Sequence, residues 1–286
     1  TGALDNGMDY YILENETPAN RIYIRLIVRA GSNLEEENEQ GVAHFIEHLC
    51  FNGTKNFEKN DIVNYFEKIG MNFGSGVNAF TSFEQTVYML ECPADDPEIF
   101  KTSMQILADW AHAVSFDPEE IEKERGVVIE EWRTTNQGIT GRLSNFQIND
   151  ILKDSKHSER LPIGKPEIIK NISREEILNF YKKWYRPDLM SVVVVGDKKV
   201  SELEKVIVDT MNQIPAAEKK QILPKYNIPV QTEQHISRFV DKEQKHPIIY
   251  FIQQKTENLS CSTEEVLKEN LVCGIINSIV NSRLSE

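Results

Sequence analysis

Residues 41–50 read Gly-Val-Ala-His-Phe-Ile-Glu-His-Leu-Cys, an apolar segment that carries two histidines and one glutamate. On an α-helix, residues i and i+4 stack on one face and residue i+3 lies beside them, so His44 and His48 can reach one metal ion. Zinc suits such ligands, and a catalytic zinc lowers the pKa of a water to ~7. Glu47 is then placed to act as the general base. The alternative is two histidines at a core edge beside a solvated glutamate.

A catalytic zinc takes three protein ligands, so this hypothesis requires a third, which we expect to be an acidic residue on another element. The candidate segment is 116–132. Asp117 is a good N-cap and Pro118 suits the first helical position, so a helix is predicted to begin there. Glu124 and Glu131 lie two turns apart on one face of that helix. A solvated acidic surface is the alternative interpretation of the glutamates.

The motif H-x-x-E-H is typical of inverzincin peptidases, and residues 20–215 resemble the amino-terminal domain of the pitrilysin/insulinase family of zinc metallopeptidases, in particular its bacterial zinc proteases. The matching segments are Arg29-Ala-Gly-Ser32, Gly41 to His48 followed by Phe51-Asn-Gly-Thr54, Val77-Asn-Ala-Phe-Thr-Ser82, Glu124-Arg-Gly-Val-Val-Ile-Glu-Glu131, and Trp184-Tyr-Arg-Pro187 ahead of Val192-Val-Val-Val-Gly196. Five matches in the same order make chance an implausible explanation.

The resemblance implies a role for each acidic and histidine residue of these motifs. His44, His48 and Glu131 are the implied zinc ligands. Glu47 is the implied general base, and Glu124 is a carboxylate that supports the catalytic site without binding the metal. The sequence shows no departure from the family pattern at these positions, which argues against the inactive members of the family.

Asn78, Ala79 and Phe80 are the expected substrate-binding residues. In the resembled family this segment is an edge strand beside the zinc, and its backbone pairs with an extended substrate by β-augmentation. The spacing of residues 72–80 taken alone indicates a plain strand followed by a turn. The substrate-binding interpretation therefore rests on the resemblance.

The composition is typical of a soluble globular chain of more than one domain, with 286 residues of which 40% are hydrophobic and 27% charged. A net charge of −13 and the absence of a basic stripe disfavour nucleic-acid binding. Cysteines at 50, 92, 261 and 273 form no C-x-x-C pair. No apolar run is long enough to span a membrane. The sequence lacks an initial methionine, and a bacterial periplasm or cell envelope is favoured over the cytoplasm.

Periodicity and capping signals predict an α+β fold, with an antiparallel sheet and helices packed on one face. Strands are expected at 4–14, 21–29, 72–80, 84–92, 192–195, 235–242 and 247–255. Helices are expected over the metal motif and at 60–69, 97–114, 117–136, 140–152, 173–184, 200–213 and 262–284, and a loop is expected at 153–162.

Three segments follow from this pattern. Residues 1–213 form the predicted zinc-binding peptidase domain. Residues 214–229 contain three prolines and many charges, which predicts a linker. Residues 230–286 repeat the order strand, strand, helix and are interpreted as the truncated beginning of a second similar α+β domain, since the resembled family repeats such domains.

The predicted function is a zinc-dependent metalloendopeptidase that cleaves peptides or unfolded polypeptides by a zinc-activated water, with Glu47 as general base. The chain is interpreted as a fragment whose missing carboxyl-terminal half is its partner around the substrate. A non-catalytic zinc-binding assembly subunit is the alternative, and Glu47 discriminates the two because such a subunit needs no base. A metal-dependent hydrolase of small amides is a third interpretation.

Overall fold

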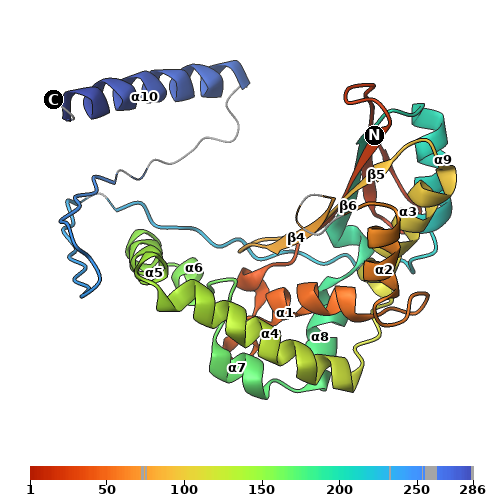
Figure 1. Ribbon diagram of the computed structural model, residues 1–286, viewed down its shortest axis with the longest axis horizontal. Coiled ribbons are helices and arrows are strands. Elements are labelled where there is room, and N and C mark those ends of the chain that lie inside the picture. Colours follow the sequence, from red (N-terminus) through yellow and green to blue (C-terminus); the bar gives the residue numbers. More distant parts are fainter. Residues whose placement is uncertain (72–73, 75, 232, 253, 255–262, 285–286) are drawn as a thin grey trace. The chain divides into compact units, whose positions relative to one another are not determined.

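Alternation of apolar and polar residues builds one six-stranded sheet in the computed structural model, which describes residues 1–71, 74, 76–231, 233–252, 254 and 263–284 (Figure 1). The spatial order is β1-β2-β6-β3-β5-β4. The strands are β1 (Gly2–Ala3), β2 (Asp9–Glu14), β3 (Arg21–Val28), β4 (Val77–Thr81), β5 (Thr86–Pro93) and β6 (Met190–Gly196). In the central strand β3, every second side chain from Ile22 to Val28 is buried.

The strand pairs are antiparallel with one exception, because β2 runs parallel to β6. The expected α+β class is confirmed. The sheet was expected to be antiparallel throughout, so the parallel pair of β2 and β6 corrects that expectation. A parallel pair cannot be joined by a hairpin and needs a long crossover. Here most of the chain, with nearly all its helices, lies between β2 and β6.

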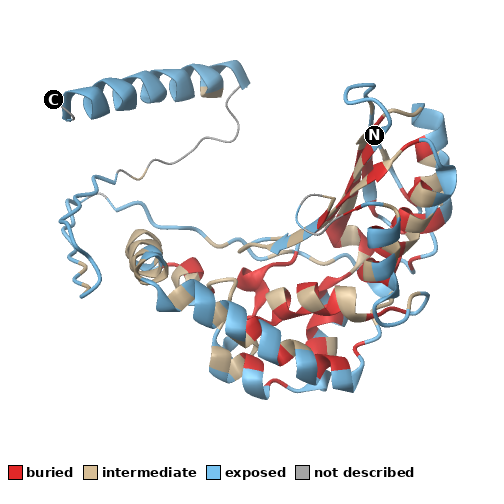
Figure 2. Cartoon of the chain, viewed as in Figure 1, coloured by how far each residue is buried: buried red, intermediate tan, exposed pale blue. Residues whose placement is uncertain are grey.

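Helices cover the face of the sheet to which the buried side chains of β3 point, and Figure 2 shows the burial where they meet it. Among them, α1, α3 and α9 contact strands directly. The helices of this part are α1 (Val42–Leu49), α2 (Asp61–Lys68), α3 (Pro97–His112), α4 (Pro118–Gln137), α5 (Ile139–Ile151), α6 (Lys156–Glu159), α7 (Pro166–Asn171), α8 (Arg174–Trp184) and α9 (Val200–Met211). Short 3₁₀ turns lie at Ser32–Leu34, Glu37–Glu39, Cys50–Asn52 and Pro187–Leu189.

Three expectations need correction. The expected loop 153–162 contains the short helix α6, and α7 was not expected at all. Within the described residues, neither 235–242 nor 247–252 contains a strand. A strand needs a neighbour for its backbone hydrogen bonds, and the apolar alternation of these segments does not supply one. Residues 72, 73, 75, 253 and 255, which also fall in expected strands, lie outside the described residues.

The chain divides into two compact units, Thr1–Pro229 with Ser237–Gln244, and Val230–Ile236 with Lys245–Glu286. The second unit contains α10 (Thr263–Leu284). The division of the chain into a domain 1–213, a linker and a second domain from 230 stays a prediction. No helix within the described ranges is long and apolar enough to cross a membrane.

The turn between β4 and β5 is held against the segment that follows β3. The backbone N–H groups of Ser32 and Asn33 donate to the carbonyl oxygens of Ser82 and Phe83 at 3.1 and 2.8 Å. A Cβ atom on Gly31 would lie 2.3 Å from the Ser82 carbonyl oxygen. Glycine is therefore required at position 31 because two backbone segments approach closely there. This contact fixes the carboxyl end of β4, which lies at the site described below.

Candidate metal centre

Helix α1 begins at a glycine and takes its cap from a glutamate six residues upstream. Gly41 has a φ of 98°, a conformation that favours glycine, and it has no side chain to cap the helix. The Glu35 carboxylate accepts hydrogen bonds from the N–H groups of Gly41 and Ala43, both at 2.9 Å. Burial raises the pKa of Glu35 to about 8, although the two N–H groups favour its charged form. The acidic loop before the motif thus supplies a buried anchor for α1.

The two histidines of α1 meet a glutamate of α4. The Glu131 Oε2 atom lies 3.2 Å from His48 Nε2 and 3.8 Å from His44 Nε2. One potential ligand atom from each of the three residues lies within 4.8 Å of the others. Ligand atoms ~2.0–2.2 Å from a tetrahedral zinc are about 3.3–3.6 Å apart. The two distances to Glu131 are close to this range, and the donor set of two nitrogens and one oxygen suits zinc.

Arg125, the residue after Glu124, links α4 to α1 and to the end of α7. Its guanidinium donates to the carbonyl oxygens of Ile169 and Ile172, the latter at 2.6 Å, and lies 5.6 Å from the centre of the Phe45 ring. Phe45 belongs to α1, and the two carbonyls belong to the end of α7. One buried cation thus links the two helices that carry the candidate ligands, and satisfies carbonyls that α7 leaves without a helical partner.

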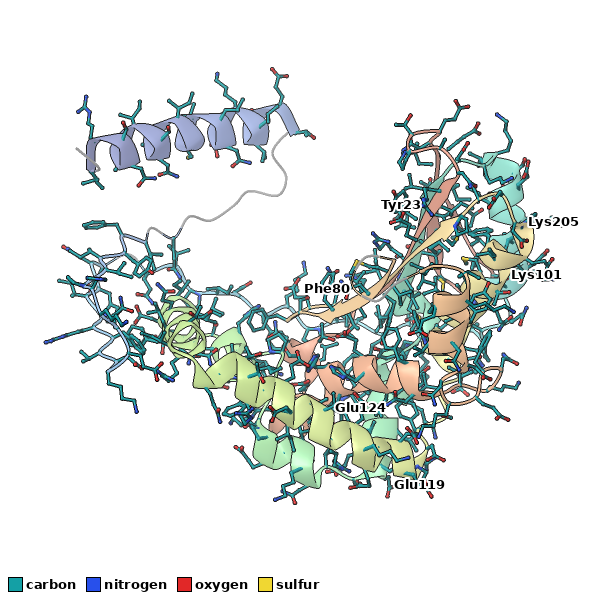
Figure 3. All side chains as sticks on the ribbon, in the orientation of Figure 1. Tyr23, Phe80, Lys101, Glu119, Glu124 and Lys205 are labelled. Carbon is teal, nitrogen blue, oxygen red and sulfur yellow. The ribbon has the colours of Figure 1, made fainter. Side chains whose placement is uncertain are left out.

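Glu124 supports His48 from the side opposite Glu131. Its Oε1 atom lies 2.8 Å from His48 Nδ1, and its Oε2 atom accepts a 2.7 Å hydrogen bond from the side-chain amide of Asn52. Figure 3 shows Glu124 on α4 beside α1. A carboxylate on the second nitrogen of a histidine fixes the ring and its tautomer, so that the other nitrogen is free to bind a metal.

The pKa values of the two histidines shift in opposite directions. Burial, together with the nearby His48, lowers the pKa of His44 to about 4. Burial acts in the same direction on His48, but hydrogen bonds to Glu124 and Glu131 outweigh it and raise its pKa to about 9. The hydrogen bond to His48 lowers the pKa of Glu131. At neutral pH the metal-free site therefore holds one neutral imidazole, one imidazolium and ionised carboxylates.

Glu47 lies on the same helix and bonds to the edge strand. Its Oε2 atom accepts a 2.6 Å hydrogen bond from the Thr81 hydroxyl. Only 7% of Glu47 is exposed, and burial raises its pKa, while the Thr81 bond acts in the opposite direction. An elevated pKa suits a carboxylate that has to take up a proton.

Strand β4, which holds Asn78, Ala79 and Phe80, is an edge of the sheet. At its two ends, Glu91 N–H donates to Gly76 O and Ser82 N–H donates to Gln85 O, both at 2.8 Å. Hydrogen-bonded pairs recur at every second residue of an antiparallel ladder. The even-numbered residues of β4 therefore bond to β5, and the odd-numbered residues direct their backbone groups to the free edge.

Ala79 and Thr81 thus offer backbone groups at the free edge beside α1. The N–H of Ala79 donates to the Asn78 side-chain oxygen at 2.9 Å, while no hydrogen bond from a described residue occupies the Ala79 carbonyl or the Thr81 N–H. The Phe80 side chain lies on the face of β4 that points away from α1, and it is 42% exposed. Figure 3 labels it on β4. Edge groups of this kind are what strand addition uses.

The structure brings His44, Glu47, His48, Glu124 and Glu131 together with β4 beside them, whereas the Phe80 side chain lies on the other face of that strand. It also adds three residues that sequence reasoning did not select, Glu35, Asn52 and Thr81. Asn52 and Thr81 belong to the segments that carry the family resemblance, so a signal was present at both positions. Glu35 belongs to an acidic segment, and nothing in the sequence distinguishes it as the buried glutamate of that segment.

Two family models match the chain. The model described as insulinase (peptidase family M16) matches residues 10–159, and the model described as peptidase M16 inactive domain matches residues 171–286. The chain belongs to the insulinase family of peptidases. The predicted family is therefore confirmed.

Named relatives agree with this assignment. A probable zinc protease PqqL of Haemophilus influenzae is 34% identical over 100% of the chain and 31% of its own length. A zinc protease PQQL-like protein of Arabidopsis thaliana is 39% identical over 85% of the chain and 25% of its own length. Zinc is the metal that this membership implies, and the chain spans about a third or less of these relatives.

The fold also agrees with the assignment to the insulinase family. The crystal structure of the first half of the periplasmic protease PqqL from Escherichia coli superposes with a TM-score of 0.77 at 35% identity. The match covers 81% of this chain and 49% of that one. The sheet and its helices thus match about half of the first half of that protease.

Substituting Glu124 and Glu131 of α4 one at a time should separate a ligand from its support. Glu131→Gln removes an anionic oxygen from the candidate metal centre, and stoichiometric tight zinc should be lost. Glu124→Gln leaves the three ligand atoms in place, and should weaken zinc binding by about 10- to 100-fold. Elemental analysis and competition with a chromophoric chelator measure both. Retention of zinc by Glu131→Gln and its loss from Glu124→Gln would show that the ligand assignment is wrong.

Zinc binding should release about one proton at about pH 6, below the pKa of ~7 of a zinc-bound water, because His48 is then charged without metal and His44 is neutral. Raising the pH removes the proton that competes for His48, so affinity should rise by about tenfold per pH unit between about pH 5 and 8. Calorimetric titration in buffers of different ionisation enthalpy counts the protons. Release of two protons would contradict this charge distribution.

Proposed function

We propose that this chain carries the catalytic centre of a zinc metalloendopeptidase that hydrolyses peptides or unfolded polypeptides. The observation that carries the proposal is the convergence of His44 and His48 Nε2 atoms on Glu131, with a buried glutamate on the same helix. Membership of the insulinase family and relatives named zinc proteases support it.

His44, His48 and Glu131 would hold the zinc, and Glu124 would orient His48. When bound, zinc supplies a Lewis acid that lowers the pKa of a water and polarises a carbonyl. Three protein ligands leave a coordination position open, which is the arrangement of catalytic rather than structural zinc.

Glu47 is the proposed general base. Thr81 occupies its Oε2 atom, and no described residue bonds to Oε1, so Oε1 can accept a proton from water and pass it to the leaving amine. A non-catalytic zinc-binding subunit has no use for this carboxylate. Burying an ionisable group costs free energy, and the metal ligands do not require Glu47.

The free edge of β4 is the proposed substrate site. An extended peptide that pairs with Ala79 and Thr81 would lie along α1, within reach of the zinc ligands and Glu47. Pairing through the main chain gives affinity with little dependence on sequence. This property suits an endopeptidase that acts on unfolded segments.

The rest of a longer protein is the proposed partner of this chain, since the chain spans about a third or less of its named relatives. That remaining part, which includes the carboxyl-terminal half, would close over the substrate. The periplasm is the proposed compartment, because a similar structure is that of a periplasmic protease.

Glu47→Gln in the full-length protein should keep the fold and the zinc, because it removes a base and no ligand. Turnover of a fluorogenic peptide should fall by ~10²–10⁴-fold or more. Glu130→Gln is a matched control, since Glu130 lies on α4 beside Glu131 but is exposed and bonds to Arg133. Unchanged turnover in Glu47→Gln with the control equally active would refute the mechanism.

The 286-residue chain alone should bind zinc but show weak or no peptidase activity. A site that stays open to water lacks the excluded-solvent electrostatics that supply much of an enzyme's rate. Adding the rest of the protein in trans should restore cleavage of an unfolded polypeptide. Efficient digestion by the chain alone, abolished by Glu47→Gln to exclude a contaminant, would be the contrary result.

A further inference from the structure

Thr81 occupies a position that the zinc ligands and the base do not explain. It is the last residue of β4, and its hydroxyl donates to Glu47 Oε2 at 2.6 Å. Odd-numbered residues of β4 direct their side chains toward α1, as the burial of Val77 and the exposure of Asn78 show. The strand that would bind substrate therefore touches the proposed base through this one hydrogen bond.

The Thr81 hydroxyl is itself held in place. Thr81 stands opposite Thr86 in the β4–β5 ladder, and their Oγ1 atoms are 3.3 Å apart. The Thr86 hydroxyl donates to the Ala30 carbonyl at 2.9 Å. The next residue, Ser82, is fastened by the close approach to Gly31. Strand pairing and the Ser82 contact fix the backbone that carries the Thr81 hydroxyl, so they limit where the carboxylate oxygen that accepts its proton can lie.

This bond determines which oxygen of Glu47 stays available. A carboxylate only accepts hydrogen bonds, so the single Thr81 proton is directed to Oε2. With Oε2 engaged, rotation of the carboxyl group is restricted and Oε1 is left for the reacting proton. Glu47 is buried, so bulk water does not readily replace the lost donor. The backbone of the same residue faces the free edge of β4.

We propose that Thr81 is a positioning residue, which orients the Glu47 carboxylate for proton transfer and couples that orientation to the strand that pairs with substrate. The inference rests on the proposed function. It assigns to Thr81 an effect on the rate of the chemical step rather than on substrate or metal affinity. A merely structural tie between β4 and α1 would act on stability alone.

Thr81→Val and Thr81→Ser in the full-length protein test the proposal. Valine keeps the shape and removes the donor, so kcat should fall by about 10- to 100-fold with KM and zinc content nearly unchanged. Serine keeps the donor and should restore kcat to within about threefold of the parent. If Thr81→Val does not fold, Thr81→Ala replaces it in the same comparison. In a Glu47→Gln background, Thr81→Val should produce no further loss, because the two residues act as a unit.

Thr54→Val is the matched control for the loss of a buried bond. The Thr54 hydroxyl donates to the Asp109 carboxylate at 2.6 Å, and both residues are buried. This variant should lower the unfolding midpoint without the loss of kcat. An unchanged kcat in Thr81→Val, or an equal loss in Thr81→Ser, would overturn the proposal.

Crystal structures of the Thr81 variants give a readout that does not depend on activity. The Glu47 carboxyl group should be rotated or split between two conformers in Thr81→Val, and unchanged in Thr81→Ser. One undisturbed conformer in Thr81→Val would also overturn the proposal. If Glu47→Gln keeps full turnover, the proposed function fails instead, and these structures still decide whether Thr81 orients Glu47.

Discussion

Removal of ionisable groups from water is the constraint on which the site depends. Helix α1 carries two histidines and a glutamate into a region where each charged form loses solvation. His48 and Glu47 each take a hydrogen-bond partner with a fixed position, whereas the Nδ1 atom of His44 has none among the described residues. Glu124 and Glu131 stabilise the charged form of His48, Asn52 supports Glu124, and Thr81 supports Glu47. The surrounding elements are arranged to deliver these partners, and the geometry of the candidate metal centre follows from them.

Placement of α4 is the second requirement, because it supplies groups to both sides of His48. Glu124 and Glu131 lie two turns apart on this long helix, and both contact the imidazole of His48. The buried Arg125 between them bonds to the end of α7 and lies over Phe45 of α1. A single guanidinium, with its planar set of donors, thus sets the separation of the two helices. The candidate metal ligands are consequently positioned with the help of Arg125, which bonds to other residues.

Local signals predicted much of this site and long-range contacts account for the rest. The spacing of His44 and His48 follows from helical periodicity, and the Asp117 cap of α4 follows from side-chain chemistry. Both depend on residues a few positions apart. The bond from Thr81 to Glu47 and the parallel pairing of β2 with β6 join distant segments. Apolar alternation in 235–255 predicted strands, but alternation supplies no partner for their backbone groups, and the described residues there form none.

The hydrogen bond from Ala79 N–H to the Asn78 side chain affects how readily the exposed edge strand β4 pairs with another strand. An open edge invites pairing with other copies of the same chain. Here the outward donor of Ala79 is already occupied by the amide oxygen of its own neighbour. A visiting strand must displace that oxygen and so exchanges one hydrogen bond for another, with little net gain. Asn78 thus lowers the gain from pairing at the Ala79 donor, while the Ala79 carbonyl and the Thr81 N–H stay open among the described residues.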